Sequence, residues 1–248
     1  MDNTPTYDGR YDFWYNSPFV FNFDDLEISV KCIDEDAKIN VNLLLYADGK
    51  LNELFEKKIK FILSSNNIQP EYVNLFIDWI DKDSIISHYG AEINDYIDTF
   101  SKVKPSNTEF KSIDEFKFIK NLANNFTDYF DDTTINLFNY LTIYGDNQYN
   151  INTVSAAVLD SFGFLDAVEI NAILEFRNKY PITKIDGLTD LIPELKKNSF
   201  DLIDGYLKTK SDILNFQITV KSQTNLFIRL IWIYNKTEGR TLFQKIIL

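Results

Sequence analysis

The spacing of apolar residues changes period twice along the chain, and this constrains the fold more than any other feature. Residues 26–33 alternate apolar and polar side chains, which predicts a half-buried strand. The alternation returns after residue 211, where residues 212–221, 225–234 and 240–248 predict an antiparallel meander of three strands. Because an isolated strand is not stable, the early strand needs the C-terminal meander as its partner.

Between about residue 40 and residue 208 the apolar spacing is helical. Helices are expected over 52–65, 69–80, 112–122, 132–144, 155–162, 166–180 and 200–207. Ser112 precedes one of them with Glu115 three residues later, the spacing of a capping box. The pattern predicts an α+β protein: a sheet domain from residues 1–33 and 209–248, interrupted by an inserted helical domain over residues 34–208.

Residues 1–23 are expected to be irregular, because Pro5, Gly9 and Pro18 interrupt them. The chain contains a single cysteine, Cys32, so it forms no intrachain disulfide and builds no cysteine-based zinc site. Cys32 falls on the apolar side of the early strand, where it is expected to be a small buried side chain.

The charge of the chain restricts its partners. The formal net charge is -12 and the isoelectric point is about 4.6, which disfavours nucleic-acid backbones and anionic lipid surfaces. Cations and partners with basic patches fit better. No apolar run reaches the roughly 18 to 20 residues that a membrane-spanning helix needs.

An Asn-x-Asn motif precedes an apolar segment twice, in residues 38–44 and in residues 149–159. Asparagine is among the best helix N-cap residues, so capping explains both occurrences. An internal duplication is the alternative.

Residues 151–191 resemble a helix-hairpin-helix unit, in which a hairpin between two helices presents backbone N–H groups to a DNA phosphate. Here the hairpin is the sequence SFGFLD with Gly163, and Asp166 stands where an anion would be repelled. Seven acids oppose three bases over residues 150–195, which makes a poor DNA surface. DNA binding is kept as the alternative function.

Acidic residues gather after the helix expected over residues 69–80. Asp78, Asp81 and Asp83 lie within six residues, and Glu92 follows. Carboxylates at a helix C-terminus meet the negative end of the helix dipole, so a bound cation or the side chain of Lys82 is expected to offset them. Hard cations such as Ca²⁺ bind acidic loops of this kind, although the spacing is not that of an EF-hand. A solvated loop is the other interpretation.

No serine-hydrolase elbow, phosphate-binding loop or dinucleotide fingerprint occurs in the sequence. The chain has 37 carboxylates, so pairs of acids alone do not point to an enzyme; a metal-dependent enzyme would need a cleft around a bound ion.

Several landmarks together resemble one family in order and spacing. DEDAKINVNLL (34–44) looks like that family's D-E-x-G-K-I-N-x-N-x-L, and FIDWIDKDSIISHYGAEINDY (76–96) looks like its D-W-I-D-x-D followed by G-A-E. KSIDEFKFI (111–119) and LTIYGDNQYNINTVSAAVL (141–159) resemble its next two conserved segments. The family is the large minor pseudopilin of bacterial type II secretion, general secretion pathway protein K. Ala37 and Val154 depart from its pattern.

The resemblance implies a pilin-like antiparallel sheet interrupted by a large helical domain, and no catalysis. It implies a subunit that caps the tip of a short periplasmic pseudopilus together with other minor pseudopilins, with secreted cargo or the outer-membrane channel as further partners. The family's N-terminal apolar helix is missing from residues 1–248, so the chain is expected to be an ectodomain at the periplasmic face of the inner membrane.

The resemblance also implies a calcium site in the inserted domain. Its expected ligands are Asp78, Asp81, Asp83 and Glu92, which match the family's acidic motif. Asp34 and Asp36 are alternative ligands, whereas Trp79 and Ile80 are expected to be core residues.

Overall fold

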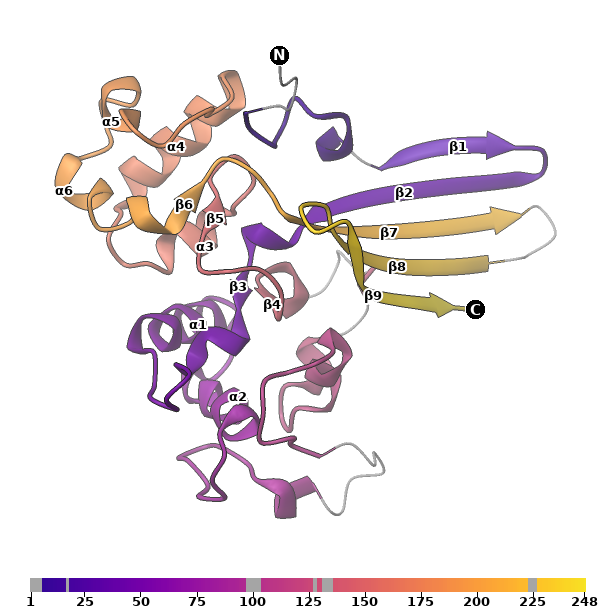
Figure 1. Ribbon diagram of the computed structural model, residues 1–248, viewed down its shortest axis with the longest axis vertical. Coiled ribbons are helices and arrows are strands. Elements are labelled where there is room, and N and C mark those ends of the chain that lie inside the picture. Colours follow the sequence, from indigo (N-terminus) through magenta and orange to yellow (C-terminus); the bar gives the residue numbers. More distant parts are fainter. Residues whose placement is uncertain (1–5, 17, 97–103, 127–128, 131–135, 223–226) are drawn as a thin grey trace. The chain divides into compact units, whose positions relative to one another are not determined.

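The structure is a computed structural model, which describes residues 6–16, 18–96, 104–126, 129–130, 136–222 and 227–248. Its main sheet has five strands in the order β1-β2-β7-β8-β9, and every neighbouring pair is antiparallel (Figure 1). The strands are β1 (Phe19–Phe23), β2 (Leu26–Asp34), β7 (Ile213–Ser222), β8 (Phe227–Asn235) and β9 (Arg240–Ile247). The predicted α+β class, the C-terminal meander and its pairing with the early strand are confirmed.

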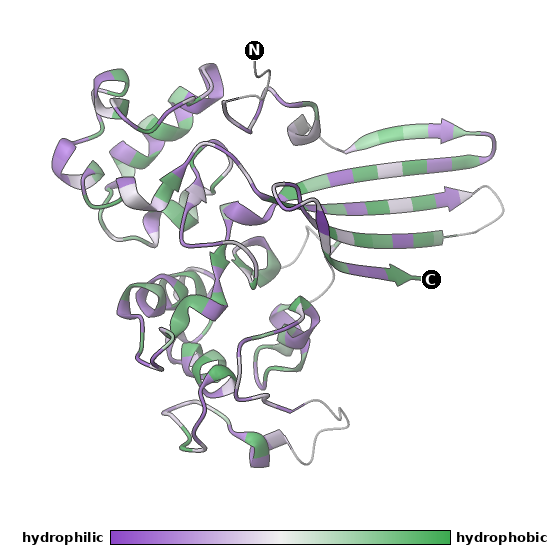
Figure 2. Cartoon of the chain, viewed as in Figure 1, coloured by the Kyte–Doolittle hydropathy of each residue, from purple (hydrophilic) through white to green (hydrophobic). Residues whose placement is uncertain are grey.

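Alternation of side chains gives the sheet two different faces (Figure 2). One face carries Cys32, Val30 and Ile28 of β2 beside Phe216, Ile218 and Val220 of β7. The other face carries polar residues of the same strands, such as Lys31 and Gln217. The Cys32 thiol is buried, as predicted, in a cluster with Trp14 and Leu214, and burial raises its pKa to about 12.

The expectation of an irregular N-terminus is wrong for residues 19–23. This segment forms β1, which pairs with β2 through a two-residue turn at Asp24 and Asp25. Asp24 has a φ of 52°, the left-handed backbone that such a turn requires. Five residues are too few to show a period by themselves, so the pairing with β2 decides their conformation.

The helices are shorter and fewer than the apolar spacing indicates. The α-helices are α1 (Glu53–Ser65), α2 (Val73–Ile80), α3 (Ala156–Asp160), α4 (Ala167–Lys179), α5 (Leu188–Leu191) and α6 (Lys197–Phe200). Four two-residue strands form two parallel pairs, β3 (Ile39–Asn40) with β4 (Leu141–Thr142) and β5 (Tyr149–Asn150) with β6 (Leu207–Lys208).

Three predicted helices need correction. The capping box of Ser112 and Glu115 is present, but it begins a 3₁₀ helix, Ile113–Phe118. In 132–144 the described residues form a 3₁₀ turn (Leu137–Asn139) and β4, while 132–135 lie outside the described residues. In 200–207, α6 ends at Phe200 and a 3₁₀ turn, Asp204–Tyr206, follows. The 3₁₀ turns of these segments keep short-range backbone hydrogen bonds, such as Tyr140 N–H to the carbonyl of Leu137 and Tyr206 N–H to that of Ile203. The strands β4 and β6, which follow two of these turns, pair instead with distant strands, and that pairing prevents a continuous helix.

The chain divides into two compact units. One contains residues 1–37, 144–156 and 164–248, and the other contains residues 38–143 and 157–163. The second unit has an aromatic core in which Trp79 stacks on Phe110 with ring centroids 5.4 Å apart, and in which Phe76 and Phe116 pack edge to face. Trp79 and Ile80 are buried, as predicted. The domain boundaries expected after residues 33 and 208 stay a prediction.

The first asparagine of each Asn-x-Asn motif forms a local turn. The Oδ1 of Asn40 accepts from the N–H of Asn42 at 2.9 Å, and the Oδ1 of Asn150 accepts from the N–H of Asn152 at 3.0 Å. Asn40 lies in β3 and Asn150 in β5, and each of these two-residue strands pairs in parallel with a strand that is distant in the sequence. The capping interpretation is therefore confirmed for Asn40, which begins a 3₁₀ helix.

The second asparagine of each motif makes a long-range cross-link. Asn42 donates to the carbonyl of Phe110 at 3.0 Å and accepts from its N–H at 2.8 Å. Asn152 makes the same pair of bonds with Ile182, both at 2.9 Å. Local capping does not require this second contact, so the two motifs share a tertiary arrangement as well as a sequence pattern. This favours the duplication that the sequence left open.

No helix among the described residues has the length and apolar character needed to cross a membrane.

The cross-links predict a specific loss of stability. Asn152 is 4% exposed, so Asn152→Ala leaves the N–H and the carbonyl of Ile182 buried without a side-chain partner. We expect a loss of about 2 to 4 kcal/mol in the free energy of unfolding, measured by urea denaturation. Asn171→Ala, at an exposed position of α4, is the control and should change little. Equal urea midpoints for the two variants would contradict this role of Asn152.

Candidate metal centre

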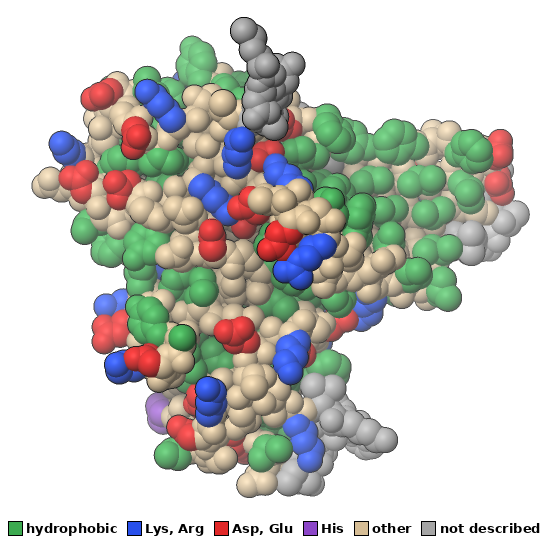
Figure 3. Space-filling model, in the orientation of Figure 1, with side chains coloured by type: hydrophobic (Ala, Val, Ile, Leu, Met, Phe, Trp, Pro, Cys, Tyr) green, Lys and Arg blue, Asp and Glu red, His purple; other side chains and the backbone are tan. Residues whose placement is uncertain are grey.

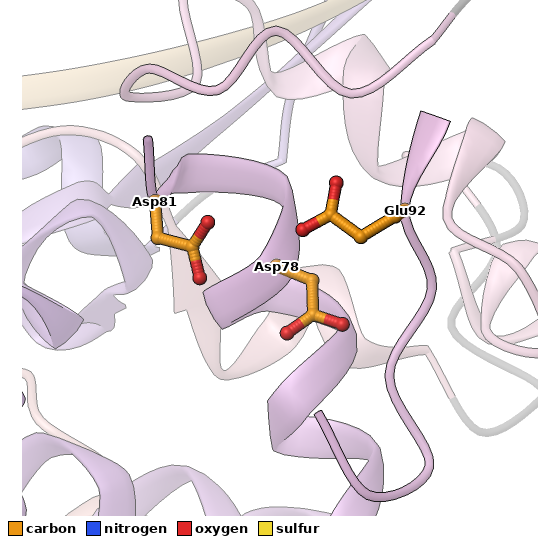
Figure 4. A group of neighbouring side chains, drawn as sticks. All are labelled: Asp78, Asp81 and Glu92. Carbon is orange, nitrogen blue, oxygen red and sulfur yellow. The ribbon is translucent and has the colours of Figure 1, made fainter. Parts of the chain in front are cut away.

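Three of the four acids predicted as ligands come together in the unit that contains α1 and α2. Asp78 lies in the last turn of α2, Asp81 follows its end, and Glu92 precedes the 3₁₀ turn Ile93–Tyr96. One carboxylate oxygen from each residue lies within 4.8 Å of the others. Figure 4 shows the three side chains gathered around the end of α2. α2 forms because Val73, Phe76 and Ile80 bury one apolar stripe, and this packing fixes where its acidic end lies.

The site buries Asp78 and Glu92 completely and Asp81 in part. Asp78 is 0% exposed and Glu92 is 2% exposed. The Oδ1 atoms of Asp78 and Asp81 and both carboxylate oxygens of Glu92 are buried and accept no hydrogen bond from any described residue. A buried charge without a partner is costly, so these oxygens require either protons or a cation.

The same arrangement shifts the acidity of the group. Burial raises the pKa of Asp81 from 3.8 to about 6, with further contributions from the charges of Asp83 and Asp78. Burial also raises the pKa of Glu92, together with the charges of Asp81 and Asp78. Mutual repulsion of this kind is what a divalent cation between the carboxylates would relieve.

The loop between Asp81 and Glu92 is built around the carboxylate of Asp78. The N–H of Ser87 donates to Oδ2 of Asp78 at 3.1 Å, and the carbonyl of His88 accepts from Nδ2 of Asn74 at 2.7 Å. Gly90 passes so close that a Cβ atom there would lie 2.0 Å from Oδ2 of Asp78. Gly90 is the glycine of the Gly-Ala-Glu motif, and this close approach to Asp78 could not be seen from its sequence position.

Asp83, the fourth predicted ligand, is not in the group of three. It is exposed, and its Oδ1 accepts from the N–H of Ile85 at 2.7 Å in a local turn. Its carbonyl accepts from Asn107 at 2.7 Å. Asp83 therefore shapes the loop and adds negative charge next to Asp81.

The alternative ligands Asp34 and Asp36 already have donors or a cation of the protein beside them, although Oδ1 of Asp36 is also buried without a hydrogen-bond partner among the described residues. Oδ2 of Asp34 accepts from Thr153 at 2.5 Å and also from the hydroxyl of Ser211. Oδ2 of Asp36 accepts from the N–H of Asp212 at 2.5 Å and lies 3.3 Å from Nζ of Lys208. Burial raises the pKa of Asp36 to about 7. Because Lys208 supplies a cation here, the group around Asp78 is the better candidate for a metal.

The donor set suits a hard cation. Three carboxylates with unpaired oxygens, all from one short segment, are typical ligands of Ca²⁺, which prefers oxygen and completes its shell with carbonyls or water. Within the described residues this group contains no histidine or cysteine, which transition metals would favour.

The model of the type II secretion system protein K family matches residues 37–128 of this chain. Residues 37–128 are a protein K domain. The predicted resemblance to the protein K family is thereby confirmed, and the matched residues include Asp78, Asp81 and Glu92. No curated protein sequence matches the chain.

A likeness in fold extends over almost the whole chain. A chain in the crystal structure of the GspK-GspI-GspJ complex from the enterotoxigenic Escherichia coli type 2 secretion system superposes with a TM-score of 0.68. The alignment covers 95% of this chain and 85% of that chain at 14% identity, which establishes a shared fold. With the family match, this confirms the prediction of a type II secretion minor pseudopilin.

The DNA-binding alternative finds no support in the family match or in the hairpin. Asp166 is the N-cap of α4 and accepts from the N–H groups of Val168 and Glu169 at 2.9 and 3.0 Å. Its other oxygen lies 2.5 Å from Nζ of Lys196. The helix N-terminus that would face a phosphate is therefore occupied by a carboxylate of the protein itself.

The contact between Gly90 and Asp78 predicts that a single methyl group disrupts the site. The Cβ atom of Gly90→Ala would lie 2.0 Å from Oδ2 of Asp78, which is shorter than van der Waals contact allows, so the loop or the carboxylate must move. We expect a loss of about 1 to 3 kcal/mol in unfolding free energy, measured by denaturation with and without Ca²⁺. Gly205→Ala is the matched control because nothing lies within 4 Å of its added Cβ. Equal stability of the two variants would show that the loop tolerates the methyl group.

Proposed function

We propose that the chain is a non-enzymatic minor pseudopilin that helps to cap the tip of a type II secretion pseudopilus, on the periplasmic side of the bacterial inner membrane. The observation that carries the proposal is the protein K domain at residues 37–128, within a chain that shares its fold with a chain of the GspK-GspI-GspJ complex. By analogy with that complex, its partners are the two smaller minor pseudopilins of its own secretion system. Secreted cargo and the outer-membrane channel are further candidate partners.

The chain order supports a pilin-like sheet with an inserted domain. β2 and β7 are neighbours in the sheet, although residues 35–212 lie between them in the sequence. The protein K domain falls inside that interval. We take this interval to be the inserted domain predicted over residues 34–208, because it holds all six α-helices of the described residues.

The sheet offers a surface for assembly. From Cys32 to the hairpin tip, the face that carries Ile28, Val30, Ile218 and Leu230 has no charged side chain. Figure 3 shows this continuous hydrophobic area over the strands. Apolar areas of this extent mark interaction sites in soluble domains. An apolar helix of the kind that pseudopilins carry would cover this face in the assembled pseudopilus.

We also propose that Asp78, Asp81 and Glu92 hold a Ca²⁺ ion that stabilises the inserted domain. The unpaired buried oxygens and the raised pKa values of Asp81 and Glu92 support this role. When bound, the ion would supply positive charge and no chemistry. Asp78 and Asp81 would hold it from the end of α2, and Glu92 from the segment that follows the 84–91 loop.

Calcium should stabilise the protein in a way that depends on the three carboxylates. A ligand that binds only the folded state at about 100 times its dissociation constant adds about 2.7 kcal/mol, so the melting temperature should rise with Ca²⁺. Glu92→Gln should abolish this rise. Without Ca²⁺ the same variant should be at least as stable as the unmodified chain, because it removes repulsion between buried carboxylates. Asp201→Asn, at an exposed position, should keep the full rise.

The pH dependence of this effect has a defined sign. The folded pKa of Asp81 is raised above its ordinary value, so without a cation its contribution to stability is present below about pH 4 and is lost as the pH rises through about 6. Ca²⁺ requires the ionised carboxylates, so the rise in melting temperature should be largest above about pH 6 and shrink toward pH 5. This site would be excluded if Ca²⁺ raised the melting temperature equally at about pH 5 and above about pH 6, or if Glu92→Gln kept the rise.

The assembly proposal predicts a complex in solution. The purified chain should co-elute with the ectodomains of the two smaller minor pseudopilins of the same system at about 10 µM, measured by size-exclusion chromatography with light scattering. Failure to co-elute at any ratio would count against the role. Binding should not depend on Asp201→Asn, which leaves the sheet unchanged.

A further inference from the structure

The outer edge of the sheet at β1 is open. β1 is the terminal strand in the order β1-β2-β7-β8-β9, and no described strand lies on its outer side. Phe23 and Leu26 flank a two-residue hairpin turn, so they form a hydrogen-bonded pair. Hydrogen-bonded and non-hydrogen-bonded pairs alternate along antiparallel strands, so Phe21–Ile28 and Phe19–Val30 are hydrogen-bonded pairs as well. The residues between them, Val20 and Asn22, therefore point their N–H and carbonyl groups away from β2.

β1 lacks the charged residues and the register shift that protect the opposite edge of the sheet. Its sequence FVFNF contains no charged residue and no proline. The opposite edge strand, β9, carries Arg240 and Lys245, and its pairing with β8 contains a register shift at Ile233 and Tyr234. Charges and bulges of this kind keep sheet edges from pairing with other chains. The two edges are thus built differently, and only β1 is suited to accept a strand.

Exposed aromatic side chains run along this edge. Phe13 is 79% exposed, Phe21 is 55% exposed and Phe23 is 67% exposed. The rings of Phe13 and Phe19 lie 5.7 Å apart, which extends the row beyond the end of the strand. Such large exposed rings on an edge give an added strand apolar side chains to pack against.

We propose that β1 accepts an extended segment of another minor pseudopilin as a sixth strand of the sheet. The proposal rests on the proposed pseudopilin role and specifies the surface that one partner uses. Unpaired backbone groups at regular spacing select a strand, because a helix has no free N–H or carbonyl groups along its side.

The surroundings of β1 also specify the chemistry of that segment. Its residues on the side of Phe21 and Phe23 should be apolar or aromatic. The hairpin tip carries Asp24 and Asp25, and Glu27 follows, so the end of the segment beside the tip should carry lysine or arginine. A second copy of this chain offers β1 itself, which has no basic residue, and therefore fits less well.

The test removes one outward N–H group from β1. Val20→Pro deletes that donor, and proline is tolerated there because the group does not bond to β2. Val20→Thr keeps the donor and the strand preference and is the matched control. Binding of each variant to the ectodomains of the two smaller minor pseudopilins is measured by titration calorimetry, and circular dichroism verifies that each variant is folded. We expect Val20→Pro to weaken binding to one ectodomain at least about tenfold and Val20→Thr to leave it unchanged.

Hydrogen exchange provides a second measurement that needs no variant. Binding of the partner should slow exchange at the amides of Val20 and Asn22. Neutralising the tip with Asp24→Asn and Asp25→Asn should reduce the salt dependence of binding. Tight binding that Val20→Pro does not change, or protection only elsewhere, would overturn the edge proposal and leave the pseudopilin role intact. Absence of binding by the unmodified chain would instead overturn the pseudopilin role and the edge proposal with it. Self-association of the chain that Val20→Pro abolishes would identify a second copy as the occupant and overturn the choice of partner.

Discussion

The pairing of β2 with β7 is the constraint on which the rest of the structure depends. It joins Leu26–Asp34 to Leu214–Ser222, across the interval of residues 35–212. Closing a loop of this length costs entropy, although the cost grows only slowly with loop length. Buried hydrogen bonds offset that cost where the interval begins and ends. Asp34, the last residue of β2, accepts from Ser211, which precedes β7, and from Thr153 and Asn150 within the interval.

The unit that contains α2 uses one carboxylate for two purposes. Oδ2 of Asp78 accepts from the N–H of Ser87 in the following loop, and Oδ1 of the same carboxylate, beside Asp81 and Glu92, is buried without a partner in the part of the chain that the structure describes. The order of the loop and the charge of the proposed site are therefore linked. A cation that neutralises the three carboxylates would also stabilise the loop that Gly90 allows to approach them.

The sheet presents two surfaces with different chemistry, and each selects a different kind of partner. Its apolar face offers side chains alone and suits an apolar helix. Its β1 edge offers backbone donors and acceptors as well, and suits a strand. A subunit that meets two neighbouring pseudopilins at once would need two such distinct surfaces, which connects the proposed tip position to the architecture of this unit.

Elements whose apolar and polar side chains alternate over many residues could be predicted from the amino-acid order alone. Alternation from Leu26 to Ile33 and after Asp212 requires strands, because only that conformation separates apolar from polar faces at a period of two. The amino-acid order also predicted the acidic group, since Asp78 and Asp81 share the end of one helix. Features without a long repeat could not be predicted in this way, because they form through contacts between segments that are distant in the sequence. β1 forms because β2 supplies its hydrogen bonds, and Asn42 and Asn152 cross-link to Phe110 and Ile182, which the chain brings near only on folding. Asp83 is only two residues from Asp81, but its carboxylate accepts from the N–H of Ile85 and does not join the group. Glu92 is farther along the chain, but the loop that passes Asp78 brings it next to Asp78 and Asp81.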